Sequence, residues 1–301
     1  MSTQKAKARF CSCMPNPNPL DILTRSSGKK SGQRAVFLTN TAWNVGETIR
    51  IAFMGGTLEQ RRHVQKVASE WLQYANLKFK WNVPVQQSDV RIAFDTEDGS
   101  WSYMGRQSRS IDTESATMNF GWLSERPSAS ERGTILHEFG HLLGLGHEHQ
   151  NPKGGLTWKR DVVIESLSGE PNNWSVDTIE SNVLEQYTED DPDVFATDFD
   201  PKGIMLYYFP AEWNEQGVAT NENEELSNKD KATIAQMYPY ENGQDWEINL
   251  NDADEGNDGD RPDNSSGDNN NNNVDEAGCF GGCARALNAF ARALAKRTPR
   301  K

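Results

Sequence analysis

The histidines of this chain are concentrated in one short segment, and that segment constrains the fold more than any other feature. Four of the five histidines in the 301 residues lie between positions 137 and 149. On an α-helix, His137 and His141 are one turn apart on the same face, so their imidazoles can occupy two corners of a tetrahedral zinc site. Gly144 can then adopt a positive φ, end the helix and let the chain bring His147 to a third corner.

The residues around this triad favour a catalytic zinc over a structural one. Three protein ligands leave the fourth position open for water, which is typical of catalytic sites. Glu138 lies next to His137 and is predicted to act as the general base toward that water. A fourth imidazole would close the position that catalysis needs, so we expect His149 to face solvent or the rim of the cleft.

Hydropathy patterns on both sides of the triad predict an α+β domain. A Ser128/Glu131 capping box marks the start of the helix that carries the histidines. We expect the segment between residues 95 and 115 to be a loop. The predicted strands are 48–53, 77–82, 89–94 and 116–123, and the other predicted helices are 57–75, 158–167, 176–187 and 229–237.

Composition separates this domain, residues 35–243, from what lies on either side. Residues 1–34 form a basic tail with Cys11 and Cys13, and no apolar signal peptide is visible in it. Residues 244–278 are an acidic Asn/Asp-rich segment that we expect to be a disordered linker. Residues 279–301 read as a basic amphipathic helix containing Cys279 and Cys283.

Charge and cysteine usage limit the partners of these segments. The net charge of −13 argues against a general nucleic-acid surface, and no apolar run is long enough to span a membrane. The last helix could dock on the acidic domain or make weak contact with an anionic membrane. Asp252, Asp254 and Asp263 faintly resemble a calcium loop, with Asn257 where a glycine is needed. The cysteines could be free thiols, a local disulfide or a metal site.

The spacing His137-Glu138-x-x-His141-x-x-Gly144-x-x-His147 resembles the signature of the metzincin clan of zinc metalloendopeptidases. Met205, in Asp-Pro-Lys-Gly-Ile-Met-Leu-Tyr, is similar to the methionine of that clan's turn below the metal. Glu148 after the third histidine and Tyr207 two residues after Met205 resemble the astacin family. So do the segments 99–105, 117–123 and 147–152.

The resemblance implies a fold and a role for several residues. It implies a twisted mixed five-stranded sheet, an active-site helix and a C-terminal helix, with strand 116–123 as the edge where an extended substrate pairs. Tyr207 would ligate or approach zinc and stabilise the oxyanion, although it could also be a packed aromatic residue. The domain lacks the family's cysteines, and His-Gln-Asn-Pro follows Glu148 where astacins have Arg-x-Asp-Arg, so we expect Glu148 to be structural.

These features predict a zinc-dependent endopeptidase acting on protein or peptide substrates. By analogy with the matrixins, Cys11 or Cys13 could cap the zinc with a thiol. Family resemblance favours an extracellular location, although the sequence itself leaves the compartment open. Two alternatives remain: a catalytically silent zinc-stabilised binding protein, against which the presence of Glu138 argues, and a hydrolase of other amides or esters.

Overall fold

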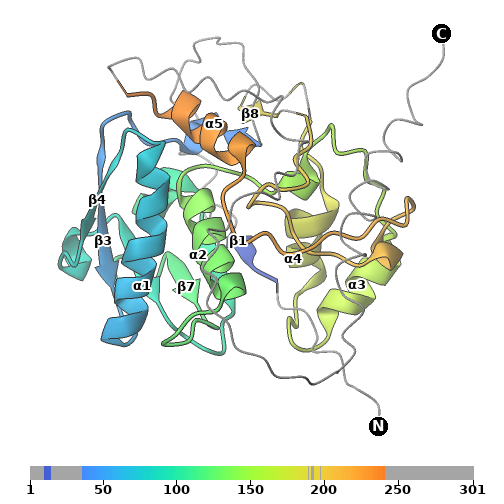
Figure 1. The fold of residues 1–301 in the computed structure, drawn as a ribbon. Helices are drawn as coiled ribbons and strands as arrows, with labels where there is room; N and C mark the ends of the chain where they lie inside the picture. The colour runs from blue at the N-terminus through green and yellow to red at the C-terminus, as the bar shows by residue number, and fades with distance from the viewer. Residues whose placement is uncertain (1–9, 15–35, 189, 191–192, 197, 241–301) are drawn as a thin grey trace, which may run out of the picture.

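One mixed sheet organises the protein, which we describe from a computed structural model (Figure 1). The structure describes residues 10–14, 36–188, 190, 193–196 and 198–240. The strands of the sheet lie in the order β1-β6-β7-β5-β3-β4, and every pair is parallel except β6–β7. Their bounds are β1 Ser12–Met14, β3 Thr48–Phe53, β4 Lys78–Trp81, β5 Val90–Ala93, β6 Ser100–Tyr103 and β7 Met118–Phe120.

Two helices pack side by side against this sheet, α1 (Leu58–Ala68) and α2 (Ala129–Leu142) (Figure 1). Capping boxes begin both: Thr57 with Gln60, and Ser128 with Glu131. Apolar side chains of the strands and of both helices meet in one buried cluster, which we call the sheet core. Burial of those faces, more than helix propensity, is what holds α2 in place.

The second half of the domain is built mostly from loops and short helices. Its helices are α3 (Arg160–Ser168) and α4 (Val176–Ile179), the latter continued by a π-helical turn at Glu180–Leu184. Their apolar residues form a second buried cluster, which we call the loop core. Helix α5 (Asn228–Met237) packs back onto the sheet core through Ile234, and β2 (Phe37–Leu38) pairs with β8 (Val194–Phe195) as a separate ribbon.

Several expectations about the elements need correction. The segment 95–115 is not all loop, because Ser100–Tyr103 forms β6. The sheet therefore has six strands among the described residues, since β1 comes from the region expected to be a tail. The strand predicted at 116–123 is not the edge, because β6 lies outside β7. The predicted helix 57–75 is an α-helix only to Ala68 and continues as a 3₁₀ turn at Ser69–Gln73.

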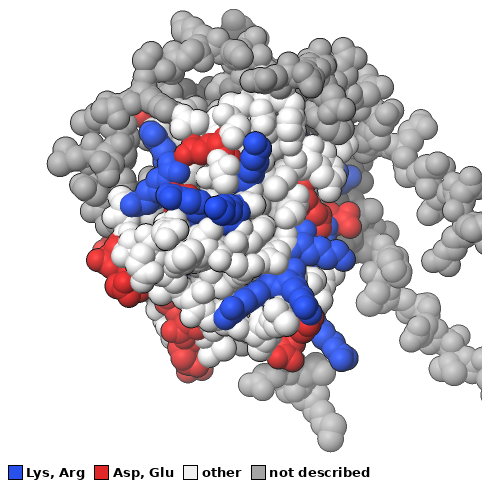
Figure 2. Space-filling model, turned by 90° about the vertical axis from the view of Figure 1, so that its left-hand side faces the viewer, with Lys and Arg blue, Asp and Glu red and all other residues white. Residues whose placement is uncertain are grey.

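Charge is mixed over the surface near β3, β4 and α1. Figure 2 shows basic and acidic side chains next to one another on that face, with no continuous field of one sign. Within the part of the chain that the structure describes, no helix has the length and apolar character needed to cross a bilayer. The acidic linker, the calcium-like loop and the basic C-terminal helix all lie outside the described residues.

Candidate active site

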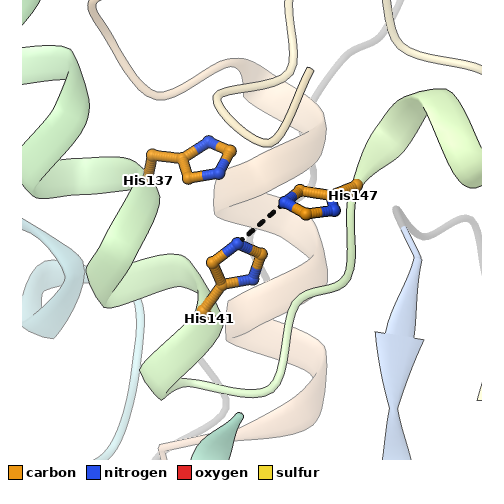
Figure 3. Close-up of side chains that lie close together, drawn as sticks. All are labelled: His137, His141 and His147. Atoms are coloured by element: carbon orange, nitrogen blue, oxygen red, sulfur yellow. Dashed lines mark hydrogen bonds between the residues drawn. The ribbon is translucent and has the colours of Figure 1, made fainter. Parts of the chain in front are cut away.

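The three histidines predicted from the sequence come together (Figure 3). His137 and His141 project from α2, and His147 enters from the loop that follows the helix. Gly144, with φ of +98°, makes the turn that the sequence predicted. One ring nitrogen from each histidine lies within 4.8 Å of the others, and the Nε2 atoms of His141 and His147 are 3.0 Å apart.

Each of these rings is oriented by a hydrogen bond at Nδ1. The acceptors are Ile204 O for His137 (2.8 Å), Leu145 O for His141 (2.9 Å) and Gln150 Oε1 for His147 (3.1 Å). With the proton on Nδ1, the lone pair of every Nε2 is free to point into the common centre. Nε2 of His137 is buried there with no hydrogen-bond partner among the described residues.

This arrangement fits a tetrahedral metal. The observed separations, from 3.0 Å up to at most 4.8 Å, bracket the about 3.3 Å expected between two nitrogens that share a tetrahedral zinc. Burial lowers the pKa of His137 to about 4, and burial followed by the neighbouring histidines lowers the pKa of His141 and His147 far below the usual value. Neutral imidazoles are the form that binds a metal.

Glu138 is fully buried one residue beyond the first histidine. Burial raises the pKa of its carboxyl group well above the usual value. Neither carboxylate oxygen has a hydrogen-bond partner of ordinary geometry among the described residues. A buried carboxyl group with a shifted pKa beside three converging histidines is a candidate functional group.

The turn that contains Met205 lies directly beneath α2. A Cβ on Gly140 would come within 2.3 Å of Met205 Sδ, so a larger residue at this position of the helix would require the buried Met205 side chain to move. Glu148 ties the same turn to the third histidine: its backbone N donates to Met205 O, and its Oε1 accepts from the backbone N of Asp200. Burial raises the pKa of Glu148 to about 8. We assign Glu148 this connecting role.

Tyr207 lies against the triad. Its ring centroid is 4.4 Å from that of His147 and 5.7 Å from that of His137. Its hydroxyl donates a hydrogen bond to the carbonyl oxygen of Cys11. The side chain therefore packs on the ligand rings and also directs its hydroxyl to the group that lies across the site.

The segment Phe10–Met14 lies against the site, next to Tyr207 and Glu138. Its strand β1 pairs in parallel with β6, with Ser12 opposite Trp101. Cys11 lies beside Glu138, and burial followed by the Glu138 charge raises the pKa of the Cys11 thiol. Within the described part of the chain, Cys11 and Cys13 form no disulfide. Residues 10–14, from the region predicted to be a basic tail, thus occupy the sheet edge next to Glu138 and Tyr207.

The expectation for His149 is wrong. This side chain is fully buried, its Nε2 lies 2.8 Å from Asn182 O, and its ring stacks on His147 at 5.0 Å. The ring of His149 thus packs against the ring of the third histidine, His147. Sequence reasoning also missed β6, although Trp101 and Tyr103 alternate with serines after Gly99, a strand signal that was available.

Comparisons with known proteins agree with this geometry. The family model for the astacin family of peptidases matches residues 36–239. A structure of myroilysin is 34% identical, with a TM-score of 0.64, and covers 68% of this chain and 99% of its own. A crystal structure of myroilysin is 32% identical, with a TM-score of 0.52, and covers 76% and 99% respectively.

More distant similarity is weak. High choriolytic enzyme 1, a hatching enzyme zinc-protease from Oryzias latipes, is 14% identical with a TM-score of 0.46 over 69% of this chain and 98% of its own. A search of curated proteins found no significant match.

The fold and the histidine triad are those of a metzincin-like zinc metalloendopeptidase. Within that class, the chain belongs to the astacin family of peptidases. The predicted fold class and enzyme class are confirmed.

Proposed function

We propose that this protein hydrolyses peptide bonds with one zinc ion held by Nε2 of His137, His141 and His147, with Glu138 as the base. The observation that carries the proposal is that each Nδ1 is already hydrogen-bonded, which leaves three buried Nε2 atoms converging beside the buried carboxylate of Glu138. Zinc bound there would polarise the scissile carbonyl and make a water molecule more acidic.

Glu138 takes a proton from the attacking water and later gives it to the leaving amine. Glu138 follows His137 on α2 and is fully buried beside the three histidines, which suits a group that exchanges a proton with a water held there.

Tyr207 donates a hydrogen bond to the oxyanion. Burial raises the pKa of Tyr207 well above the usual value, so the phenol keeps its proton and remains a donor at neutral pH. Its present acceptor is a peptide carbonyl, that of Cys11, which is the chemical group that a substrate would bring.

An extended substrate pairs with β6. The backbone of β1 already pairs with this edge as an additional strand, and main-chain pairing of this kind places few demands on sequence. Activity in the complete chain therefore requires displacement of Phe10–Met14. Cys11, beside Glu138, is the residue of this segment that would cap the zinc, as the matrixin analogy suggested.

The test uses the full chain with a site-specific protease sequence inserted between Gly28 and Lys29, assayed before and after opening at that site. We expect the opened, zinc-loaded protein to cleave an unfolded protein substrate. Glu138→Ala should still bind one zinc per chain by elemental analysis yet lose activity by about 10²- to 10⁴-fold. Tyr207→Phe should lower kcat more than it raises KM.

Three results would contradict parts of this proposal. If the opened chain binds zinc and cleaves no protein substrate, the peptidase proposal fails, which leaves a zinc-stabilised binding protein or a hydrolase of other amides or esters. If Glu138→Ala retains full activity, the assignment of the base is wrong. A Cys11→Ser variant that leaves the uncut chain as inactive as before would remove the capping role.

A further inference from the structure

The side chain of Phe10 fills a position lined by aromatic rings. Its ring stacks on Trp213 at 5.3 Å between centroids and contacts Tyr207 at 5.7 Å and Trp174 at 6.4 Å. Only 8% of Phe10 is exposed, and its backbone N donates to Asn172 Oδ1 at 3.0 Å. We call the position between the three rings the Phe10 pocket.

The walls of the pocket are held by the rest of the domain, not by Phe10. Trp213 is buried in the loop core, and its Nε1 donates to Ser166 Oγ on α3. The backbone N of Trp174 donates to Leu167 O, which anchors that residue to the end of α3. Tyr207 packs on the metal-site histidines. An occupant other than Phe10 would therefore meet the same rings.

The pocket adjoins the reaction centre. Cys11, the next residue, lies beside Glu138, and its carbonyl oxygen accepts the hydrogen bond from Tyr207. One residue of extended chain advances by about 3.3 Å. A peptide whose scissile bond lies at Glu138 would therefore place a side chain that flanks this bond into the Phe10 pocket.

We propose that the Phe10 pocket is the main specificity pocket and selects substrates with a large aromatic side chain directly flanking the scissile bond. This inference rests on the proposed peptidase function. Flat rings on three sides suit edge-to-face and stacked aromatic contacts. Among the described residues, Phe10 contacts three aromatic rings and the Asn172 side chain, so an acidic side chain in its place would lose its hydration against uncharged groups.

The first experiment maps cleavage of a mixed peptide library by the opened, zinc-loaded full chain. We expect Phe, Tyr or Trp to be enriched at one of the two positions flanking the cleaved bond. Replacing that residue with Ala in a single peptide should lower kcat/KM by about 10- to 200-fold. Enrichment of small or acidic residues at both positions would overturn the proposal.

Substitution of a residue that lines the Phe10 pocket tests whether this pocket causes the preference for aromatic side chains. Trp174 is partly exposed even with Phe10 in place, so Trp174→Ala should fold while reducing the Phe-over-Ala ratio at the flanking position. Trp81→Ala is the matched control, since Trp81 lies on β4, at the opposite edge of the sheet from β1. An unchanged ratio in Trp174→Ala would contradict the assignment, as would an equal fall in both variants.

A binding experiment separates this inference from catalysis. A synthetic peptide spanning Lys5 to Asn16 is titrated into the opened Glu138→Gln chain, together with peptides carrying F10A and F10D, and tryptophan fluorescence is recorded. The expected loss of affinity is about 10- to 200-fold for F10A and greater for F10D. If binding depends strongly on Phe10 while the opened chain that keeps Glu138 cleaves no peptide of the library, the peptidase proposal fails and the pocket stands. Equal binding of all three peptides would sink the pocket.

Discussion

The sheet core and the loop core are built differently, although the active site needs both. The sheet core joins strands and the two helices α1 and α2, and it positions His137, Glu138 and His141 on a regular helix. The loop core joins short helices and irregular segments and contributes Tyr207 and the Phe10 pocket. A regular helix thus carries three of the candidate site residues, while the less regular half holds the groups that we propose contact the substrate.

The two cores meet at the Met205 turn, where Ile204 and Met205 belong to the sheet core and Leu206 and Tyr207 to the loop core. The carbonyl of Ile204 orients His137, Met205 packs under Gly140, and Glu148 joins the third histidine to this turn. We therefore expect the two halves to unfold together, and the following predictions test that comparison in order of decreasing effect.

The largest effect is expected from opening a cavity in either core. Phe139 in the sheet core and Phe209 in the loop core are both almost completely buried. Each Phe→Ala variant should lower the free energy of unfolding by about 3–5 kcal/mol. Denaturant unfolding followed by circular dichroism should show a single transition in both variants. Separate transitions would mean that the halves are independent.

Crowding the contact between the halves should have the next largest effect. Gly140→Ala forces a Cβ against Met205 Sδ, so it should cost about 1–3 kcal/mol and weaken zinc binding. Adding Met205→Ala should restore part of the zinc affinity, measured by competition with a chelating dye. Gly169→Ala is the control, because nothing lies within 4 Å of its Cβ position. Equal loss of zinc affinity in both single variants would refute the contact.

A charged cluster at the sheet provides a pH-dependent test. Asp89 accepts hydrogen bonds from Arg50 and Arg109. Burial acts to raise the pKa of Asp89, but the hydrogen bonds from the two arginines outweigh it, and the pKa is lowered. The unfolded chain therefore binds a proton more readily than the folded one, so this stabilisation is present above about pH 4 and is lost as pH falls through the lowered pKa.

Asp89→Asn should accordingly cost about 1–2 kcal/mol at pH 7, and the difference from the parent chain should vanish in acid. Thermal unfolding of both chains between pH 2 and pH 7 measures this difference in stability. A difference that stays constant across this range would show that charge is not its origin.

Removing a helix cap should give the smallest losses of unfolding free energy, and one cap in each half allows the two halves to be compared directly. Ser128 and Glu131 cap α2 reciprocally, so Ser128→Ala should cost about 1 kcal/mol. Ser175 caps only the single turn of α4, so Ser175→Ala should cost less. Chemical denaturation of the two variants gives the comparison. A larger loss for Ser175→Ala would mean that the loop core depends more on local helix formation than its burial suggests.

The sequence predicted locally encoded elements well in both halves, α2 and β3 as well as α3 and α5, and it failed where distant segments pair or pack, at β1, β6 and His149. Capping boxes, the glycine turn and helical spacing are local signals, so α2 and its histidine triad were predicted correctly, and so were β3 and β5. His149 was assigned to the surface because a short histidine-rich segment carries no information about which of its members becomes buried behind the others. Its position is set by Asn182, which lies far along the chain.

What the sequence determined by itself was the metal-binding chemistry: His137, Glu138 and His141 lie on one helix, and Gly144 returns His147, all within eleven residues and by backbone geometry alone. Only the tertiary structure decided what lies across that site. The pairing of Ser12–Met14 with β6, and the enclosure of Phe10 by Trp174, Tyr207 and Trp213, join residues more than 80 positions apart. Contacts over such separations depend on how whole elements pack, and no local pattern in the chain encodes them.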